Sequence, residues 1–335
     1  MPTRVLSQLQ VRRLLPMRKC MDLMADALRT LGRGEAVNPL RSGVRLPQQL
    51  GILGMMPGYM ESPAALGLKV VAVFPGNHGT EYDSHQGLVV LFDVEHGFPL
   101  AIMDASEITA IRTAASTGVA TELLAREDAA DLTMLGSGVQ ARTHLEAMLQ
   151  AREIRRVRVF SPNPEHCAAF AKQESKRHGV EIRACDSARE AVDGADIICT
   201  VTSSREPVLL GEWIARGAHI NAVGSSIATA RELDTHAVVR SRLFVDRRES
   251  TVNEAGDYLF PKQEGAIDED HILGEIGEIL LGSVEGRRSR EEITLFKSLG
   301  LAVEDLAAAH YVYNRAREEQ VGTEVELGGM RGAGD

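Results

Sequence analysis

Three small residues mark the strongest candidate for chemistry in the sequence. Gly136, Gly138 and Ala141 form the pattern GxGxxA, directly after an apolar run and at the start of a helical pattern. The glycines permit a tight turn and a close approach of the backbone to a pyrophosphate, and the helix N-terminus supplies N–H donors. A turn that only packs the sheet could show the same pattern. Because a strand precedes this turn and five more strands follow, we predict a dinucleotide site.

The segment after the second predicted strand bears on which dinucleotide binds. It reads Ser161-Pro162-Asn163 and offers none of the acidic side chains that usually bind the ribose of NAD. Ser161 and Asn163 can instead hydrogen-bond a 2′-phosphate, so we favour NADPH over NADH. The predicted cofactor contacts are Thr113, Gly136, Gly138, Val139, Gln140, Ser161, Asn163, Thr200, Thr202, Val223 and Ser225.

The elements around this turn alternate between short β-branched runs and helical patterns, which is typical of a parallel α/β sheet. Six strands suit one doubly wound, Rossmann-type domain, which we expect over residues 116–305. Helices are expected between them, for example at Arg142–Glu153 and Pro164–His178. The predicted strands are Asp131–Leu135, Val157–Ser161, Glu181–Ala184, Asp196–Val201, His219–Val223 and Leu243–Asp246.

The first 115 residues follow a different pattern. A helix is predicted at Met17–Leu31, followed by strands at Leu68–Phe74, Gly87–Asp93 and Pro99–Asp104, which favours a smaller α+β unit with an antiparallel sheet. Near the other end, Glu304–Glu318 is helical, and the glycine-rich tail after it does not extend the helix. We expect residues 306–335 to pack back on residues 1–115 as one discontinuous domain.

Composition excludes several classes of function. The 335 residues include 37 Lys and Arg against 47 Asp and Glu, a net charge of -10, which argues against a nucleic-acid partner. The four cysteines lack CxxC spacing and the histidines form no HxxxH or HxH set, so we expect neither disulfides nor a metal site. No export signal or apolar span is visible, and we expect a cytoplasmic protein without a membrane partner.

Four sequence blocks occur in the order of one known family. They are Gly67-Leu68-Lys69 before a loop with Asn77, MDASEITAIRTAAST at 103–117, the GSGVQA turn, and EITLFKSLGLAVEDLAAA at 292–309. With these blocks the chain resembles the ornithine cyclodeaminase/mu-crystallin family over almost its whole length. The resemblance implies a homodimer whose N-terminal unit and last helix form the dimerisation and substrate domain. It also implies that the substrate binds in an interdomain cleft against the nicotinamide ring.

The resemblance further implies that two arginines and a lysine surround the substrate, at Arg45, Lys69 and Arg112. A guanidinium binds a carboxylate through parallel hydrogen bonds, and a lysine can donate a proton at the reacting carbon's oxygen or nitrogen. Lys69 and Arg112 lie among apolar and small residues, where a charge needs a partner. A solvated loop arginine also explains Arg45. Asn77 and His85 complete the predicted substrate contacts, and an exposed loop position is the alternative for His85.

One departure from the family pattern bears on the reaction class. Cyclodeaminases of the family carry an aspartate after the fifth strand, and alignment on Arg-Glu-Leu-Asp places Ser226 there. A hydroxyl is no general base near neutral pH without an activating partner, and three cations without a carboxylate would repel a diamino acid. The other source of a carboxylate would be a loop with Glu61, Glu81 or Asp83. The predicted catalytic residues are Lys69, Arg112 and Ser226.

These observations favour an NAD(P)H-dependent reductase of a cyclic ketimine carboxylate, which would yield a cyclic L-amino acid. Ornithine cyclodeaminase, an alanine- or opine-type dehydrogenase, and a non-catalytic small-molecule binder are the alternatives. Fold analogy alone does not separate them.

Overall fold

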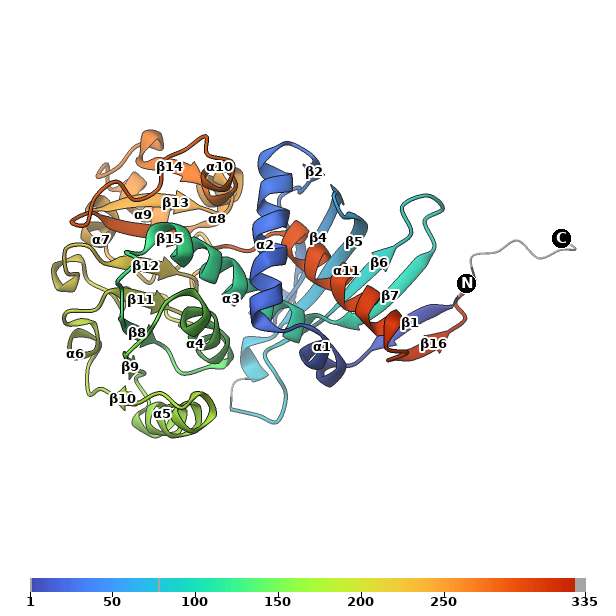
Figure 1. Ribbon diagram of the computed structural model, residues 1–335, viewed down its shortest axis with the longest axis horizontal. Helices are drawn as coiled ribbons and strands as arrows, with labels where there is room; N and C mark the ends of the chain where they lie inside the picture. The colour runs from blue at the N-terminus through green and yellow to red at the C-terminus, as the bar shows by residue number, and fades with distance from the viewer. Residues whose placement is uncertain (1, 78, 329–335) are drawn as a thin grey trace, which may run out of the picture. The chain divides into compact units, whose positions relative to one another are not determined.

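The computed structural model describes residues 2–77 and 79–328 and divides into two compact units (Figure 1). Unit 1 comprises Met1–Arg112 and Leu301–Asp335, and unit 2 comprises Thr113–Gly300. Both boundaries lie a few residues before the ones expected at 115 and 305. The first boundary falls inside helix α3 (Ala105–Leu124), so no break in secondary structure marks it.

Unit 2 is built on an eight-stranded sheet in which every pair of neighbouring strands is parallel. Several strands are buried along their whole length, which requires cover on both faces, as in a doubly wound fold. In order across this sheet B, the strands are β10 (Ile182–Ala184), β9 (Arg156–Phe160), β8 (Asp131–Leu135), β11 (Ile197–Thr200), β12 (His219–Ala222), β15 (Ile293–Lys297), β13 (Ser241–Val245) and β14 (Ile272–Glu275).

Six of these strands lie within two residues of their predicted positions, but the prediction of six strands was wrong. It missed β14 at the edge of the sheet and β15 between β12 and β13. β15 escapes detection because Thr294 and Lys297 interrupt its apolar run, although both side chains are buried and hydrogen-bonded.

Helices fill the connections between the strands of sheet B (Figure 1). The apolar core between helices and strands includes Ile198, Ile220, Leu295 and Tyr258, all at most 1% exposed. The helices are α4 (Val139–Ala151), α5 (Pro164–His178), α6 (Ala188–Val192), α7 (Thr235–Val239), α8 (Arg248–Glu254), α9 (Gly256–Gln263) and α10 (Ile276–Leu280), with 3-10 turns at Gly211–Trp213 and Glu269–His271.

Unit 1 holds a mixed sheet, sheet A, that also has eight strands among the described residues. Only the β1–β7 pair is parallel, and the strands missed in the sequence are β1 to β4 and β16. In order, the strands are β16 (Thr323–Val325), β1 (Thr3–Leu6), β7 (Pro99–Asp104), β6 (His85–Phe92), β5 (Ala64–Val73), β4 (Ile52–Glu61) and β2 (Ala36–Val37), with β3 (Ser42–Arg45) paired to β4 as well.

One face of sheet A is covered by helices α2 (Met17–Gly32) and α11 (Ala302–Glu318), and a short helix α1 (Gln8–Leu14) precedes α2. Along β5, Ala65, Gly67 and Lys69 are buried while the residues between them are not, so this set faces the helices. A side chain on Gly67 would overlap the carbonyl of Val90 and lie 2.9 Å from Leu306, which explains the glycine. Helix α11 therefore lies close against the strand that carries Lys69.

The opposite face of sheet A is also apolar, and no helix of the described residues covers it. Leu53 and Leu88 are 40% and 50% exposed, and a hollow of about 610 Å³ lies beside them, partly lined by Val70 and Ala72. Strands that are apolar on both faces are unusual in an antiparallel sheet that faces water.

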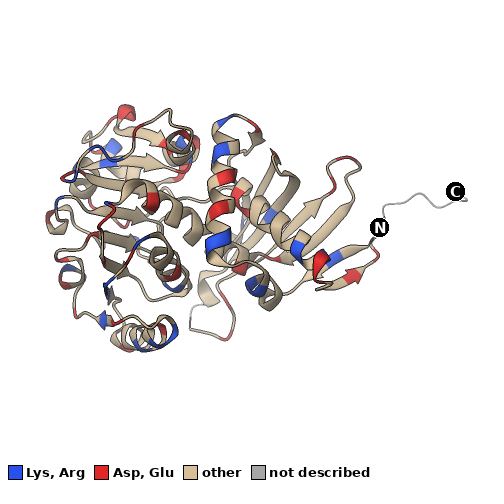
Figure 2. Ribbon diagram, in the orientation of Figure 1, with Lys and Arg blue, Asp and Glu red and all other residues tan. Residues whose placement is uncertain are grey.

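No described helix is long and apolar enough to span a membrane. Lys and Arg are interspersed with Asp and Glu over both units (Figure 2). All four cysteines are buried and none is in a disulfide.

Candidate active site

The glycine turn of unit 2 has the geometry that a dinucleotide requires. Gly136 has φ +119°, and a Cβ there would lie 2.7 Å from the carbonyl of Val201, so only glycine fits. Gly138 precedes the first turn of α4, and a Cβ there would meet nothing within 4 Å. The turn therefore leaves open space in front of a helix N-terminus, where a phosphate group can bind.

Residues at this turn also fit a bound polar group. Val139 is 62% exposed, and Oε1 of Gln140 is buried with no hydrogen-bond partner among the described residues. A buried amide oxygen is usually satisfied, so a donor from a ligand or water is expected there. The buried imidazole of His144 fixes the turn, because its nitrogens lie 2.7 Å from the carbonyl of Gln140 and 3.1 Å from the hydroxyl of Thr117. Burial lowers the pKa of His144 to about 4.

The other predicted cofactor residues follow the neighbouring strands β9, β11 and β12. Ligands of open parallel sheets bind at the carboxyl ends of the strands, and these residues share that edge with the glycine turn. Thr113, in contrast, lies in α3, where its carbonyl accepts from the hydroxyl of Thr117. The residues at the shared edge are Ser161, Asn163, Thr200, Thr202, Val223 and Ser225.

Asn163 has a structural role in addition to its predicted one. It caps α5, and its Oδ1 accepts hydrogen bonds from the backbone N–H groups of Glu165 and His166, both at 3.0 Å. Only its amide NH₂ could then donate to a 2′-phosphate. Ser161 is half-buried beside it.

A buried carboxylate that the sequence analysis did not select organises this edge of sheet B. Oε1 of Glu232 accepts from the backbone N–H and the hydroxyl of Thr202, and Oε2 accepts from the hydroxyl of Thr200 and the N–H of Gly224, all at 2.7 Å. Burial, reinforced by the nearby charge of Asp257, raises the pKa of Glu232. Both threonines are thus held by one side chain.

A buried ion pair between Lys297 and Asp257 supports the same loops. Nζ of Lys297, at the end of β15, lies 3.0 Å from Oδ2 of Asp257 and donates to the carbonyls of Ala222 and Ser225. Oδ1 of Asp257 accepts from the backbone N–H of Glu232 at 2.8 Å. The hydroxyl of Ser225 donates to the carbonyl of Ala230, so its proton serves the local fold. Ser226, next in the chain, is half-buried.

In unit 1, the structure brings together two of the predicted substrate residues, Lys69 and Arg112. Nζ of Lys69 lies 3.0 and 2.8 Å from the two carboxylate oxygens of Asp305 and 3.2 Å from the hydroxyl of Thr109. Nε of Arg112 donates to Oδ1 of Asp305 at 2.8 Å, and one of its terminal nitrogens donates to Glu304 at 2.7 Å. All four charged side chains are nearly inaccessible to water.

The expectation of cations without a matching carboxylate was therefore wrong. Glu304 and Asp305 lie in α11 and supply two negative charges beside the two positive ones. The loop carboxylates considered from the sequence, Glu61, Glu81 and Asp83, are exposed instead. The sequence did contain a clue to these two carboxylates. Glu304 and Asp305 interrupt an apolar helical run, just as Arg112 does.

Electrostatics make Lys69 a weaker base than an ordinary lysine. Burial lowers the pKa of Lys69 to about 8, the charge of Arg112 adds to the effect, and Asp305 opposes it. An ammonium group with a pKa near the working pH is suited to donate a proton.

The remaining predicted substrate residues lie apart from this pair along the strands. Arg45 is exposed at the end of β3 opposite Ile52, whereas Lys69 lies opposite Met56 of the same strand β4. Asn77 lies in a 3-10 turn after β5 and donates to the carbonyl of Asp83 at 3.0 Å.

His85 begins β6, with its Nδ1 3.0 Å from the hydroxyl of Ser84. The side chain keeps contact with solvent. Partial burial lowers the pKa of His85, the charge of Asp83 opposes this shift, and the charge of Lys69 adds to it. His85 is therefore mostly neutral at pH 7 and can donate or accept one hydrogen bond.

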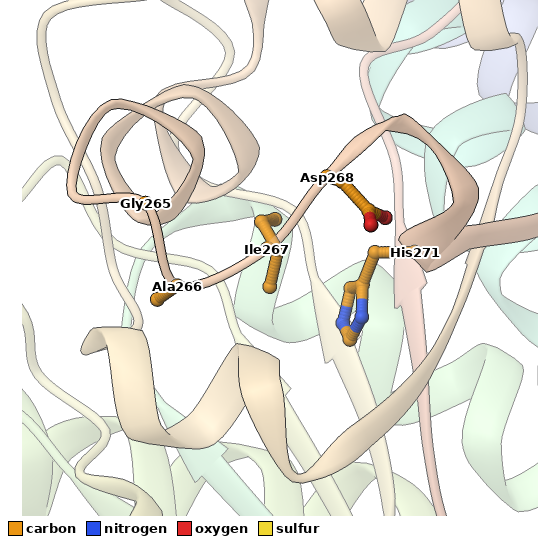
Figure 3. A pocket seen from close by; sticks show the side chains of 5 residues that line it. All are labelled: Gly265, Ala266, Ile267, Asp268 and His271. Carbon is orange, nitrogen blue, oxygen red and sulfur yellow. The ribbon is translucent and has the colours of Figure 1, made fainter.

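A second hollow, of about 300 Å³, lies in unit 2 beside Gly265, Ala266, Ile267, Asp268 and His271 (Figure 3). Its polar groups serve the local fold. His271 is 3.0 Å from the carbonyl of Val238, and Asp268 accepts from the N–H of Asp270. Over residues 2–77 and 79–328, no three His, Cys, Asp or Glu side chains are close enough together to hold a metal ion.

The fold and these sites define the class as a dinucleotide-binding protein with a Rossmann-type unit 2 and, in unit 1, a buried cluster of a lysine, an arginine and two carboxylates. The chain belongs to the ornithine cyclodeaminase/mu-crystallin family, whose model matches residues 1–320. This confirms the resemblance found in the sequence.

Three similar proteins carry reductase names. The chain is 37% identical to Delta(1)-pyrroline-2-carboxylate reductase of Bacillus cereus, covering 96% of this chain and 99% of that one. It is 42% identical to ketimine reductase mu-crystallin of Mus musculus, covering 84% and 86%. The structure of Thermococcus litoralis Delta(1)-pyrroline-2-carboxylate reductase with NADH and L-proline superimposes with a TM-score of 0.94 at 42% identity, covering 96% and 100%.

Proposed function

We propose that the chain is an NAD(P)H-dependent reductase of cyclic ketimine carboxylates, such as Δ1-pyrroline-2-carboxylate or its six-membered homologue. The product is the cyclic L-amino acid. The observation that carries the proposal is the buried ammonium of Lys69 beside Arg112, in a chain whose relatives are named as reductases of this substrate class.

In the proposed reaction the nicotinamide supplies a hydride to C2 of the ring. Lys69 donates the proton that the ring nitrogen needs as it becomes an amine. Arg112 and Arg45 supply positive charge for the substrate carboxylate, and Asn77 and His85 contribute hydrogen bonds. Ser226 remains a predicted catalytic residue at the position of the cyclodeaminase aspartate. The open turn at Gly138 and the unsatisfied oxygen of Gln140 support the nucleotide site.

The proposal is tested by measuring NADH and NADPH oxidation with pyrroline, piperideine and open-chain keto acid plus amine substrates. We expect stoichiometric oxidation with a cyclic ketimine. Preference for NADPH follows from Ser161 and Asn163, and the two nucleotides are compared in the same assay. Ammonia release from ornithine without net cofactor change would instead identify a cyclodeaminase, and no turnover with any substrate would identify a binder.

We also propose that the open apolar face of sheet A pairs with a second copy of the chain. Leu53, Val70, Ala72 and Leu88 line one hollow on this face. Contiguous exposed apolar residues mark protein interfaces, whereas scattered ones do not. Leu88→Glu should yield a monomer in light scattering, whereas Val252→Glu, at a similarly exposed position of unit 2, should leave the dimer intact. We further propose that the protein is cytoplasmic, in keeping with its unpaired, buried cysteines.

A further inference from the structure

Two adjacent carboxylates of α11 make different contacts with the buried cations of unit 1. Oδ1 of Asp305 accepts from both Nζ of Lys69 and Nε of Arg112, and its Oδ2 lies 2.8 Å from Nζ of Lys69. Glu304 accepts from Arg112 at 2.7 Å and from the backbone N–H of Leu301 at 3.1 Å. Asp305 is therefore the anion that bridges the two cations.

We propose that Asp305 is a positioning residue that keeps Lys69 in its ammonium form and holds its Nζ in place through both carboxylate oxygens. This inference rests on the proposed reductase function and adds to it a group that none of the sequence motifs assigned.

The environment of Lys69 shows why such a group is needed. Burial and the neighbouring guanidinium of Arg112 both disfavour a second positive charge. Asp305 counters them through its charge and hydrogen bonds, and the charge of Glu304 adds a smaller contribution. From β6, His85 also interacts with Lys69, but as a mostly neutral ring it has little influence at pH 7. Without Asp305, the amine would become neutral at a lower pH, so a smaller fraction of Lys69 would carry the proton that the reaction needs.

The proton balance of the step is simple. A C–H bond forms at C2 as a C–H bond of the reduced nicotinamide breaks, and an N–H bond forms at the ring nitrogen as an N–H bond of Lys69 breaks. The nicotinamide is oxidised and the imine is reduced. Lys69 is left as a neutral amine and regains a proton from solvent, while Asp305 remains ionised throughout.

The test compares Asp305→Asn with Glu304→Gln, which removes the same charge one residue away and leaves the Lys69 contact in place. The pKa of Lys69 is measured by NMR titration of ¹³C-labelled lysine, with Lys69→Met to assign the signal. The pH dependence of kcat/KM for ketimine reduction is measured on the same proteins. In Asp305→Asn we expect the pKa of Lys69 to fall by about one unit or more, and the apparent pKa of the alkaline limb of the kcat/KM profile to fall with it. In Glu304→Gln we expect clearly smaller shifts of both values.

Equal shifts in the two variants, or a uniform loss of activity without a shift, would overturn the proposal. If Asp305→Asn does not fold, the NMR titration of the wild-type protein tests the proposal. A Lys69 that is neutral throughout pH 6 to 7.5 would contradict the proposal directly. The two hypotheses can fail separately. A wild type that reduces no ketimine removes the proposed function, whereas the NMR comparison still reports whether Asp305 holds the charge on Lys69.

Discussion

Oε1 of Glu232 accepts two hydrogen bonds from a single residue, the backbone N–H and the hydroxyl of Thr202, each at 2.7 Å. Its other oxygen accepts two more, so the side chain must present acceptors on both sides. Only a carboxylate of this length does so, since an amide carries donors on one side.

Glu232→Gln should therefore damage the edge of sheet B where the cofactor is proposed to bind. The amide NH₂ would face two donors, and each buried group left unsatisfied costs about 1–3 kcal/mol. We expect the KM for the nucleotide to rise about tenfold and the free energy of unfolding to fall. Nucleotide titration and urea denaturation measure the two effects, with Glu264→Gln at the surface as the control. An unchanged nucleotide KM would mean that Glu232 serves stability alone.

Gly138→Asp should weaken nucleotide binding without unfolding the protein. The space in front of Gly138 accepts a side chain sterically, but a carboxylate there would repel a pyrophosphate and occupy its place. We expect at least a tenfold loss of affinity, or about 1.4 kcal/mol, in fluorescence titrations. Gly138→Ala is the matched control and should bind far better. Normal affinity in the aspartate variant would argue that the turn only packs the sheet.

Arg112→Lys separates the substrate role of Arg112 from its charge. Arg112→Ala would remove the buried cation that contacts both Glu304 and Asp305. Removing one partner of such a buried ion pair costs about 3–5 kcal/mol, so an effect on binding could not be separated from unfolding. Lysine keeps the charge but cannot reach Glu304 and Asp305 in two directions. We expect kcat/KM for the ketimine to fall at least about tenfold while the KM for the nucleotide changes little. If only the KM for the nucleotide changed, the substrate-binding role assigned to Arg112 would be wrong.

Two buried histidines should make unit 2 less stable in mild acid. Burial lowers the pKa of His144 to about 4 and, with the charge of Arg287, that of His219 to about 3. Both pKa values lie below the ordinary value near 6.5, so their contribution is fully present above that pH and is lost as the pH falls. From pH 7 to pH 5 each histidine should lower the free energy of unfolding by about 2 kcal/mol.

Urea denaturation at the two pH values measures this loss of stability. In His144→Gln the loss between pH 7 and pH 5 should be smaller by the contribution of one histidine, about 2 kcal/mol. A variant with an unchanged pH dependence would show that His144 is not neutral in the folded protein.

The sequence predicted the parallel sheet well because its strands are buried runs between glycine-marked turns and helical patterns. It predicted sheet A poorly for a physical reason. β4 contains Pro57 and two neighbouring glycines that resemble a turn, yet it is a continuous strand. Its partner β3 pairs only up to Met55 and β2 only from Tyr59, so the missing N–H of Pro57 falls where β4 has no neighbour on that side.

The candidate site was predicted in part. Lys69 and Arg112 stood out because charges in apolar surroundings need partners, and the structure places them together. Their partners Glu304 and Asp305 satisfied the same criterion but lie about two hundred residues away, and no local pattern pairs them. Glu232 was missed because a carboxylate in a polar segment looks solvated until the strands bring Thr200 and Thr202 around it.

The long separation between Lys69 and Asp305, 236 positions, also constrains how the chain is made. During synthesis the N-terminal strands emerge first, and their buried cations have no counter-charges until α11 leaves the ribosome. Unit 2 is one uninterrupted segment, Thr113–Gly300, and can complete its sheet before then. A nascent chain can therefore complete unit 2 before Lys69 and Arg112 meet their carboxylates, and a chain truncated before residue 302 would lack one of the two helices that cover one face of sheet A.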